Sequence, residues 1–255
     1  MLKERCRPRG VPGSWLTGAF GNTGDGHQMG LAVGAAEDEF PHAIMLDPEQ
    51  LMPYLRVNKL GKRFTPEYEP YGHLALAIQA QPGTYDFYVV DSAIGEKIDK
   101  IWTPSSSCYG PKEVWTAAAT SEHALKADTL EELAKLMEVP EDQFVATIER
   151  WNEMAAAGKD EDFNFPGEMM MTIDTPPYYA TKEFADGLCT AGGLLVDTEC
   201  RVLDKDRQPI DGLFAIGLTS GGMFFNTYPH NLNCLSHTRN CLMGYTVGQV
   251  LGDKA

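Results

Sequence analysis

Glycines cluster at the ends of short apolar runs in the last third of the chain, and this clustering constrains the fold most. Residues 194–196 and 213–216 predict two short buried strands, separated by a polar turn over residues 204–209. Glycine is used where the backbone must approach another group closely. Five glycines at these strand ends therefore predict a place where a ligand lies against the main chain: Gly192, Gly193, Gly217, Gly221 and Gly222.

Composition places the chain of 255 residues among acidic globular proteins. Its hydrophobic content of 43% and charged content of 22% are ordinary for a folded domain. The 36 acidic and 21 basic side chains give a formal net charge of -15, which repels nucleic acid and anionic lipid. The six cysteines show no zinc-type spacing, so no metal site is predicted and reduced thiols are expected.

The first residues carry positive charges without the apolar core of a signal peptide behind them. No apolar run reaches the ~20 residues that a membrane span needs. We therefore expect a cytoplasmic protein with neither a membrane nor a nucleic acid as partner.

A turn-rich loop over residues 21–26 precedes a helix expected over residues 27–36, in which glycine and alanine recur. Small side chains allow such a helix to pack closely. Free backbone N–H groups at a helix start suit a phosphate or an electron-rich ring. Taken alone, the same pattern is also that of a plain helix start.

The middle of the chain, rich in prolines and aromatic residues, predicts one strand and two helices. Residues 84–91 alternate and contain β-branched and aromatic side chains, which indicates a strand. Thr129 and Glu132 form a capping box that opens a helix over residues 130–137. The second helix is expected over residues 140–156. Three of its apolar residues fall at helical spacing and are expected in the core: Phe144, Ile148 and Trp151.

Five motifs occur along the chain in the order in which a known superfamily has them. The chain resembles the C-terminal portion of FAD-dependent flavoproteins of the fumarate reductase, succinate dehydrogenase and 3-ketosteroid dehydrogenase superfamily. The resemblance covers nearly the whole chain. The five motifs are T-G-D-G at 23–26, G-K-R-F at 61–64, T-L-E-E-L-A at 129–134, P-P-Y-Y-A at 176–180, and the glycine-rich stretch at 190–222.

The resemblance implies an α/β plus α+β fold, the C-terminal part of a Rossmann-like FAD-binding domain with an inserted cap domain. Residues 1–37 would then be a remnant of the FAD-binding domain, residues 38–187 the substrate-capping domain, and residues 188–255 the C-terminal segment of the FAD-binding domain. The G-x-G-x-x-G unit that opens such a domain is absent from this sequence. Whether the chain binds FAD without it is left open.

The resemblance also implies which residues contact FAD. The T-G-D-G loop would contact the flavin end, and the start of a last helix, expected over residues 236–251, would direct its N–H groups at the flavin. Leu218 stands where the family commonly has an acid that binds the ribityl hydroxyls. Beside the five glycines named above, the expected cofactor-binding residues are Thr23, Gly24, Asp25, Gly26, Leu235 and Ser236.

Alignment by the motifs also indicates which catalytic groups are kept. Tyr71 and Tyr228 lie near the positions of two arginines that fumarate-reducing members use, and Cys189 takes the place of a histidine. His42 is kept. Without an arginine clamp for two carboxylates, fumarate is not the expected substrate.

The resemblance instead implies hydride transfer between FAD and a carbon-carbon bond conjugated to a carbonyl, in an enone or steroid-like small molecule. Tyr228 is expected to donate a hydrogen bond to the carbonyl, with Tyr71 and His42 as further catalytic candidates. Electrons would come from a separate donor, since the sequence has no heme or iron-sulfur motif. The alternative is a truncated, non-catalytic fragment or partner subunit that needs another chain for FAD binding.

Overall fold

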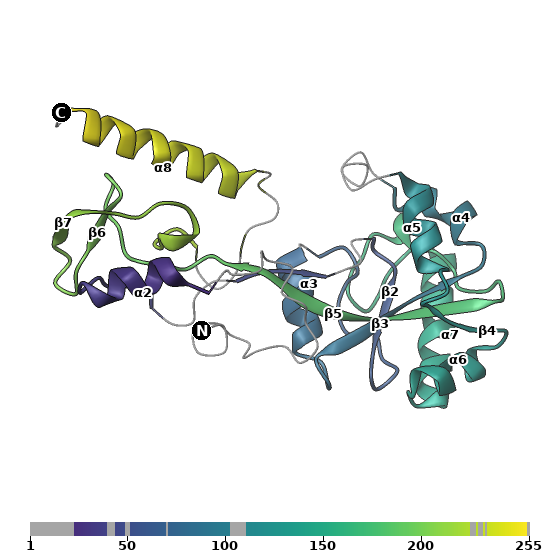
Figure 1. Ribbon diagram of the computed structural model, residues 1–255. Coiled ribbons are helices and arrows are strands. Elements are labelled where there is room, and N and C mark those ends of the chain that lie inside the picture. The colour runs from purple at the N-terminus through teal and green to yellow at the C-terminus, as the bar shows by residue number, and fades with distance from the viewer. Residues whose placement is uncertain are drawn as a thin grey trace. The chain divides into compact units, whose positions relative to one another are not determined.

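The computed structural model describes residues 23–39, 44–48, 52–69, 71–102, 111–224, 228, 232 and 234–253. The chain divides into two compact units (Figure 1). Unit 1 consists of Met1–Asp47 with Asp186–Ala255, and unit 2 is Pro48–Ala185. The division thus falls after Asp47 and after Ala185, whereas the sequence placed boundaries after residues 37 and 187.

An antiparallel sheet forms the centre of unit 2. Strand β3 (Tyr85–Asp91) pairs with β2 (Leu55–Asn58) on one side and with β5 (Tyr178–Thr190) on the other. Strand β4 (Leu125–Ala127) pairs with β5. Strand β1 (Ile44–Pro48), which belongs to unit 1 up to Asp47, is the next neighbour of β5 in the sheet. The strand predicted over residues 84–91 is confirmed as β3. It begins one residue late because Thr84 has a left-handed φ of 60°, which is turn geometry.

Two helices cover one face of this sheet. Helix α6 (Leu130–Met137) begins as predicted, because the Thr129 hydroxyl accepts a hydrogen bond from the Glu132 backbone N–H at 3.2 Å. Helix α7 (Glu141–Ala157) follows it. Phe144, Ile148 and Trp151 are buried against the sheet, which confirms the predicted core positions.

The opposite face of the sheet has a second core that the sequence reading did not predict. Because side chains alternate along β3, Tyr88 and Val90 point away from the core that contains Phe87 and Val89. Three short helices contribute to this second core, and all of them were missed: α4 (Ile94–Lys97), η1 (Ile98–Lys100) and α5 (Lys112–Ala119). Helix α3 (Tyr71–Gln79), which was also missed, contacts β3. A further short turn of helix, η3 (Gly167–Met169), follows α7.

A buried ion triad links the three central strands of unit 2. Arg56 on β2 contacts Asp86 on β3 at 2.9 Å and also contacts Glu183 on β5. The register places Asp86 directly opposite Glu183. All three side chains are at most 1% exposed, so removing the guanidinium would leave two buried carboxylates facing each other without this cation between them.

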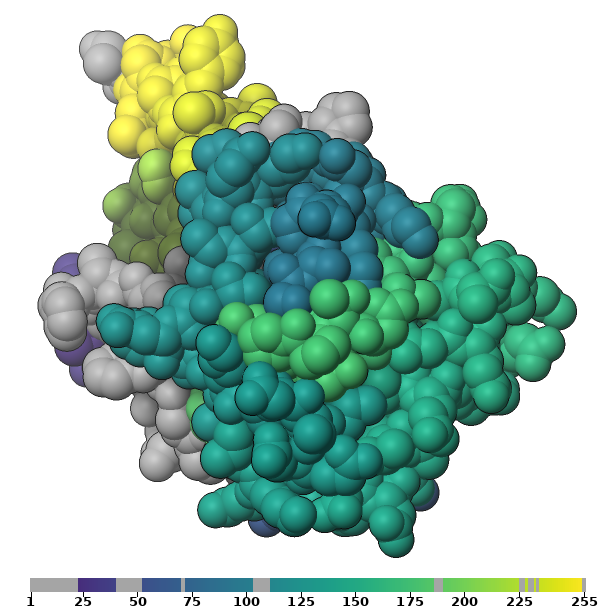
Figure 2. All heavy atoms as spheres, turned by 90° about the vertical axis from the view of Figure 1, so that its right-hand side faces the viewer, coloured from purple at the N-terminus to yellow at the C-terminus, as the bar shows by residue number. Residues whose placement is uncertain are grey.

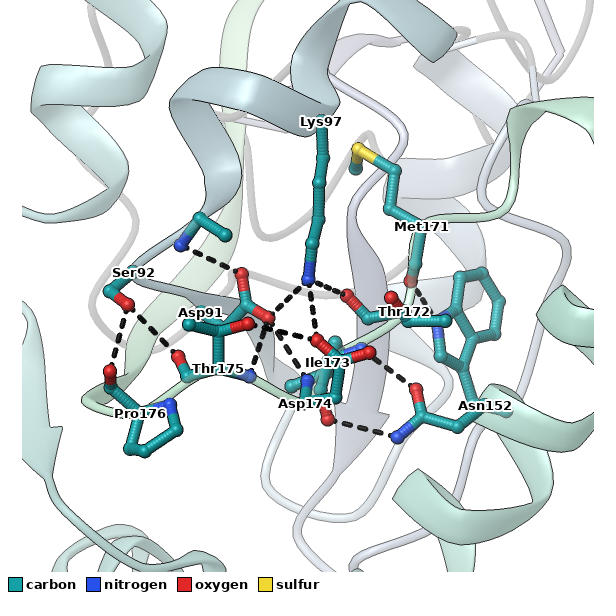
Figure 3. A network of polar contacts seen from close by, with 12 residues as sticks. Asp91, Ser92, Lys97, Asn152, Met171, Thr172, Ile173, Asp174, Thr175 and Pro176 are labelled. Atoms are coloured by element: carbon teal, nitrogen blue, oxygen red, sulfur yellow. Dashed lines mark hydrogen bonds and ion pairs between the residues drawn. The ribbon is translucent and has the colours of Figure 1, made fainter.

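A second polar network fastens the segment that leads into β5 (Figure 3). The Asp91 carboxylate, at the end of β3, accepts hydrogen bonds from the backbone N–H groups of Asp174 and Thr175, both at 3.0 Å. Lys97 of α4 donates to Asp91 at 2.5 Å and to the Thr172 carbonyl at 2.9 Å. Figure 2 shows the green segment near residue 175 at the surface beside the blue residues of α4. These bonds attach the residues directly before the P-P-Y-Y-A stretch to the end of β3 and to α4.

The described part of unit 1 contains a hairpin, two helices and a smaller apolar core. Strands β6 (Arg201–Leu203) and β7 (Pro209–Phe214) form the hairpin, and η4 (Gly217–Thr219) follows β7. The helices are α2 (Asp25–Ala32) and α8 (Leu235–Gly252). The core of this unit contains Ala35, Leu194, Val202 and Ala215.

Three sequence-based boundaries in unit 1 were wrong. Residues 194–196 form isolated bridges rather than a strand, because Leu194 pairs with Glu37 and Ser220 and Val196 pairs with Val202. Strand β7 begins before the predicted start at residue 213 and ends at Phe214. The helix predicted over residues 27–36 ends at Ala32, since Gly34 adopts a φ of 92° and turns the chain away. The polar turn at 204–209 and the last helix are confirmed.

Candidate functional site

The T-G-D-G loop lies against η4 in unit 1. Gly24, with a φ of 80°, precedes the first residue of α2, and the Thr23 hydroxyl donates to the Asp25 carboxylate at 2.6 Å. A side chain at Gly26 would place its Cβ 2.8 Å from the Thr219 side chain. The N-terminus of α2 is therefore held close to the glycine-rich turn after β7.

The glycine pairs of the last third come together on neighbouring segments. The Leu194 N–H donates to the Thr219 carbonyl at 2.8 Å, and the Gly221 N–H donates to the Leu194 carbonyl at 2.8 Å. Gly192 and Gly193 therefore lie beside the turn formed by residues 217–222. The structure thus brings together glycines that are about 30 residues apart in the sequence.

Glycine serves two different purposes in this turn. A Cβ at Gly193 would lie 2.7 Å from the Thr219 carbonyl carbon, and one at Gly221 would lie 2.7 Å from the Gly193 carbonyl oxygen. These two glycines let the chain approach itself. Gly217 and Gly222 instead adopt left-handed φ angles of 65° and 81°, and a Cβ at Gly222 would meet nothing within 4 Å. Open space beside the turn therefore lies at Gly222.

Asp38, which the sequence reading did not single out, fixes the turn from one side. Its carboxylate accepts hydrogen bonds from the Gly193 N–H at 3.1 Å and from the Gly222 N–H at 2.9 Å. The N–H groups of Gly221 and Gly222 thus bind protein acceptors. This turn would therefore contact a cofactor by van der Waals packing and not by hydrogen bonds from these N–H groups.

The N-terminus of α8 is capped by a predicted catalytic residue. Cys234 precedes the helix with a φ of 60° and its side chain makes no capping bond. The Tyr228 hydroxyl oxygen instead accepts a hydrogen bond from the Ser236 backbone N–H at 2.8 Å. The Tyr228 ring is 8% exposed and lies 5.0 Å from the Phe224 ring, centroid to centroid. Tyr228 and Ser236, predicted for separate roles, therefore contact each other.

The roles of the other two predicted catalytic residues stay predictions. Tyr71 is the first residue of α3 in unit 2. His42 lies outside the described residues. The sequence reading missed His27, whose ring nitrogen Nε2 lies 3.3 Å from the Leu218 carbonyl oxygen. Its position directly after the T-G-D-G loop was the available signal.

The residues present fit a cofactor of the FAD type at one end. The start of α2 offers backbone N–H groups of its first turn, and the partial positive charge of a helix N-terminus favours an anionic or electron-rich group. Among the described residues, nothing lies within 4 Å of a Cβ placed at Gly222, whereas one at Gly217 would lie 3.7 Å from the Asn240 side chain. Leu218 offers its carbonyl to His27 and has no side-chain acceptor for hydroxyl groups.

Residues 3–235 match the family described as FAD binding domain, and the chain belongs to this family of FAD-binding proteins. Two relatives are similar to it in sequence. The 4-oxocyclohexanecarboxylate 2-dehydrogenase of Sinomonas cyclohexanicum is 28% identical over 98% of this chain and 44% of its own length. The 3-oxosteroid 1-dehydrogenase of Mycolicibacterium smegmatis (strain ATCC 700084 / mc(2)155) is 31% identical over 84% of this chain and 43% of its own length.

A solved structure shows the same fold. The 3-ketosteroid delta1-dehydrogenase of Sterolibacterium denitrificans, solved with 1,4-androstadiene-3,17-dione, superposes with a TM-score of 0.79 and 23% identity. The match covers 100% of this chain and 51% of that one. The chain therefore spans about half the length of the proteins that it matches, and the resemblance to the ketosteroid dehydrogenase group is confirmed.

No helix within the described residues combines the length and the apolar character that crossing a bilayer requires.

Proposed function

We propose that the chain is part of an FAD-dependent oxidoreductase that transfers hydride between FAD and a carbon-carbon bond conjugated to a carbonyl. The observation that carries this proposal is the phenol of Tyr228, held at the N-terminus of α8 beside the glycine turn. The names of both relatives support it. The names give an oxo group at carbon 4 with dehydrogenation at carbon 2, and an oxo group at carbon 3 with dehydrogenation at carbon 1. In both relatives the dehydrogenated carbon is therefore two ring positions from a ketone.

The two units take different parts in this proposal. Unit 1 is the C-terminal part of a Rossmann-like FAD-binding domain, and unit 2 is the cap that covers the substrate. The buried ion triad and the Asp91 network make unit 2 a stable body without using any group expected in catalysis. Residues on the surface of unit 2 would then contact and select the substrate.

In this proposal, residues of the chain polarise the substrate carbonyl and transfer a proton. FAD, when bound, supplies the hydride acceptor or donor. Tyr228 donates a hydrogen bond from its hydroxyl to the substrate carbonyl oxygen, which polarises the neighbouring carbon-carbon bond. Because its oxygen also accepts the Ser236 N–H, the phenol becomes a stronger donor. Tyr71 and His42 are the candidates for transferring a proton to or from the substrate carbon that is bonded to the carbonyl carbon.

The substrate class follows from the same site. An enone or steroid-like ring ketone needs one hydrogen-bond donor at its single carbonyl, whereas a dicarboxylate needs paired cations. Fumarate is therefore not the proposed substrate.

A second candidate function rests on exposed apolar side chains of unit 1. Met29 and Val33 on α2 are 70% and 59% exposed, and Leu242 and Tyr245 on α8 are 63% and 64% exposed. Such side chains on two helices are typical of a surface that another polypeptide covers. The chain would then be a fragment or partner subunit that binds FAD only together with another chain.

The visible absorption spectrum of the purified chain tests both candidates. Flavin bands that persist through desalting, or that appear after FAD is added, are expected from the first. With FAD bound, a saturated ring ketone should bleach these bands without oxygen, or an enone should restore the bands of the reduced protein. A chain that takes up no FAD alone but does so when mixed with a copurifying polypeptide would support the second candidate and contradict the first.

A further inference from the structure

Arg239 joins the first turns of α8 to the glycine turn. Its nitrogen Nη2 donates to the Ser220 carbonyl at 3.0 Å, the Ser220 hydroxyl at 2.8 Å and the Gly221 carbonyl at 3.1 Å. Ser220 is 0% exposed, and Arg239 is 7% exposed. All of α8 is described, and Arg239 is its single buried residue and its single residue of the Asp, Glu, Lys and Arg types.

The charge of Arg239 is not neutralised by direct contact. Among the described residues, no carboxylate lies within ion-pair distance of its guanidinium, and its hydrogen bonds go to neutral oxygens. The face of the Phe224 ring lies 5.5 Å away. Burial lowers the pKa of Arg239, while Asp38 acts in the opposite direction, and arginine stays charged. One positive charge is therefore buried beside the turn.

Asp38 and Arg239 hold the same turn by opposite groups. The Asp38 carboxylate binds the Gly222 N–H, and the Arg239 guanidinium binds the Ser220 and Gly221 carbonyls. Each peptide of residues 220–222 is thereby fixed in orientation. A turn that only had to connect β7 to α8 would not need a buried cation, since water or the chain itself could satisfy two carbonyls.

We propose that Arg239 is a positioning residue of the cofactor site, which fixes residues 220–222 in their FAD-binding shape and supplies a buried positive charge next to the flavin. The inference rests on the proposed function. Reduction by hydride adds two electrons and one proton, so it increases the negative charge of the bound cofactor. A fixed positive charge nearby favours the reduced form over the oxidised form.

The test compares R239K, R239Q and R239M with the wild-type chain. All three hydrogen bonds of Arg239 come from one nitrogen, so the lysine ammonium is the conservative replacement. We measure FAD affinity by quenching of flavin fluorescence, and the two-electron reduction potential against a reference dye. R201Q is the matched control, because Arg201 belongs to the same unit and pairs with Asp197 on a half-exposed turn.

R239K and R201Q should bind FAD within about threefold of the wild type, while R239Q and R239M should bind it about tenfold or more weakly. In R239Q and R239M the reduced cofactor should lose about tenfold more affinity than the oxidised one, which lowers the potential by about 30 mV. If Arg239 had only a structural role, the reduction potential would not fall in R239Q and R239M and stay near the wild-type value in R239K.

The outcomes separate this inference from the proposed function. A wild-type chain that binds no FAD overturns both. Wild-type binding with unchanged affinity and potential in R239Q and R239M overturns the inference and leaves the function standing. The unfolding temperature without FAD is the second measurement. If the variants lose FAD binding only because they are unfolded before FAD is added, Arg239 serves folding alone and the inference is overturned.

Discussion

The Tyr228 hydroxyl oxygen lies 2.8 Å from the Ser236 backbone nitrogen and accepts its hydrogen bond. The first N–H groups of a helix have no partner inside the helix, so a cap of this kind stabilises the helix start. It also fixes where the phenol lies. A single contact thus connects the stability of α8 with the position of the proposed catalytic hydroxyl.

Replacing Tyr228 with phenylalanine should therefore have two effects. The Ser236 N–H loses its partner, and the free energy of unfolding should fall by about 1 kcal/mol. Reduction of a ring enone should slow by about 100-fold, because the carbonyl loses its donor. Thermal unfolding measures the first effect, and single-turnover return of the flavin bands, when the reduced protein is mixed with the enone, measures the second.

Y245F is the matched control for this variant. Tyr245 also belongs to α8, is 64% exposed, and its hydroxyl accepts a hydrogen bond from the Gln249 side chain at 3.0 Å. Its loss should change neither stability by more than about 0.5 kcal/mol nor turnover. Equal turnover in Y228F and the wild type would remove Tyr228 from catalysis and leave it as a helix cap.

Two glycine-to-alanine substitutions should change stability in opposite directions. G221A places a Cβ 2.7 Å from the Gly193 carbonyl oxygen and against the Asp38 carboxylate, so it should destabilise unit 1 by about 1–3 kcal/mol. G244A places a Cβ in open space on α8, where alanine is a better helix former, and should stabilise by up to about 1 kcal/mol. Chemical denaturation of both variants measures the difference. Equal midpoints would mean that the turn at residue 221 is not packed as described.

These glycines show where sequence reasoning reached its limit. A sequence reveals that residues 193 and 221 are small, but not which neighbour takes the space. At both positions, other atoms of the chain occupy the space that a side chain would need. The prediction that glycines gather near the site needed only their spacing, whereas their separate purposes depend on three-dimensional contacts.

Local patterns were sufficient for some elements and insufficient for others. The α6 cap joins residues three apart, and β3 alternates within seven residues, so both could be predicted. The Arg56 triad joins residues separated by 30 and by 127 positions, and no local pattern links them. The short helices α4 and α5 are also stabilised by a distant core rather than by their own sequence.

The cap of α6 should contribute measurable stability to unit 2. T129A removes the acceptor for the Glu132 N–H and should lower the free energy of unfolding by about 1 kcal/mol. T116A is the control, since the Thr116 hydroxyl bonds the Glu113 carbonyl inside α5 and alanine favours helices. T116A should be neutral or slightly stabilising. Equal losses in the two variants would contradict a specific capping role for Thr129.

The Arg63 network should make the stability of unit 2 depend on pH. Arg63 contacts the Glu67 and Asp160 carboxylates at 2.6 Å and 2.7 Å. Burial raises the pKa of Glu67 from 4.5 to about 7, against the opposing effect of Arg63. The pKa of Asp160 is lowered despite its burial, because it accepts hydrogen bonds from Arg63 and from backbone N–H groups.

The sign of the Glu67 effect follows from proton binding. Between about pH 4.5 and 7 the folded state holds the Glu67 proton and the unfolded state does not. The folded state is therefore favoured by this group at low pH, and that contribution is lost as the pH rises through about 7. Asp160 acts in the opposite sense, because its contribution is present above its ordinary pKa of 3.8 and is lost as the pH falls below it.

E67Q should remove the first dependence and D160N the second. We expect the wild-type free energy of unfolding, relative to that of E67Q, to fall by about 1–3 kcal/mol between pH 4.5 and 7. Relative to D160N, it should instead fall when the pH drops below 3.8. Urea denaturation at closely spaced pH values measures both differences. A flat difference between wild type and E67Q across that range would mean that Glu67 is ionised throughout, and that Arg63 outweighs the cost of burying its carboxylate.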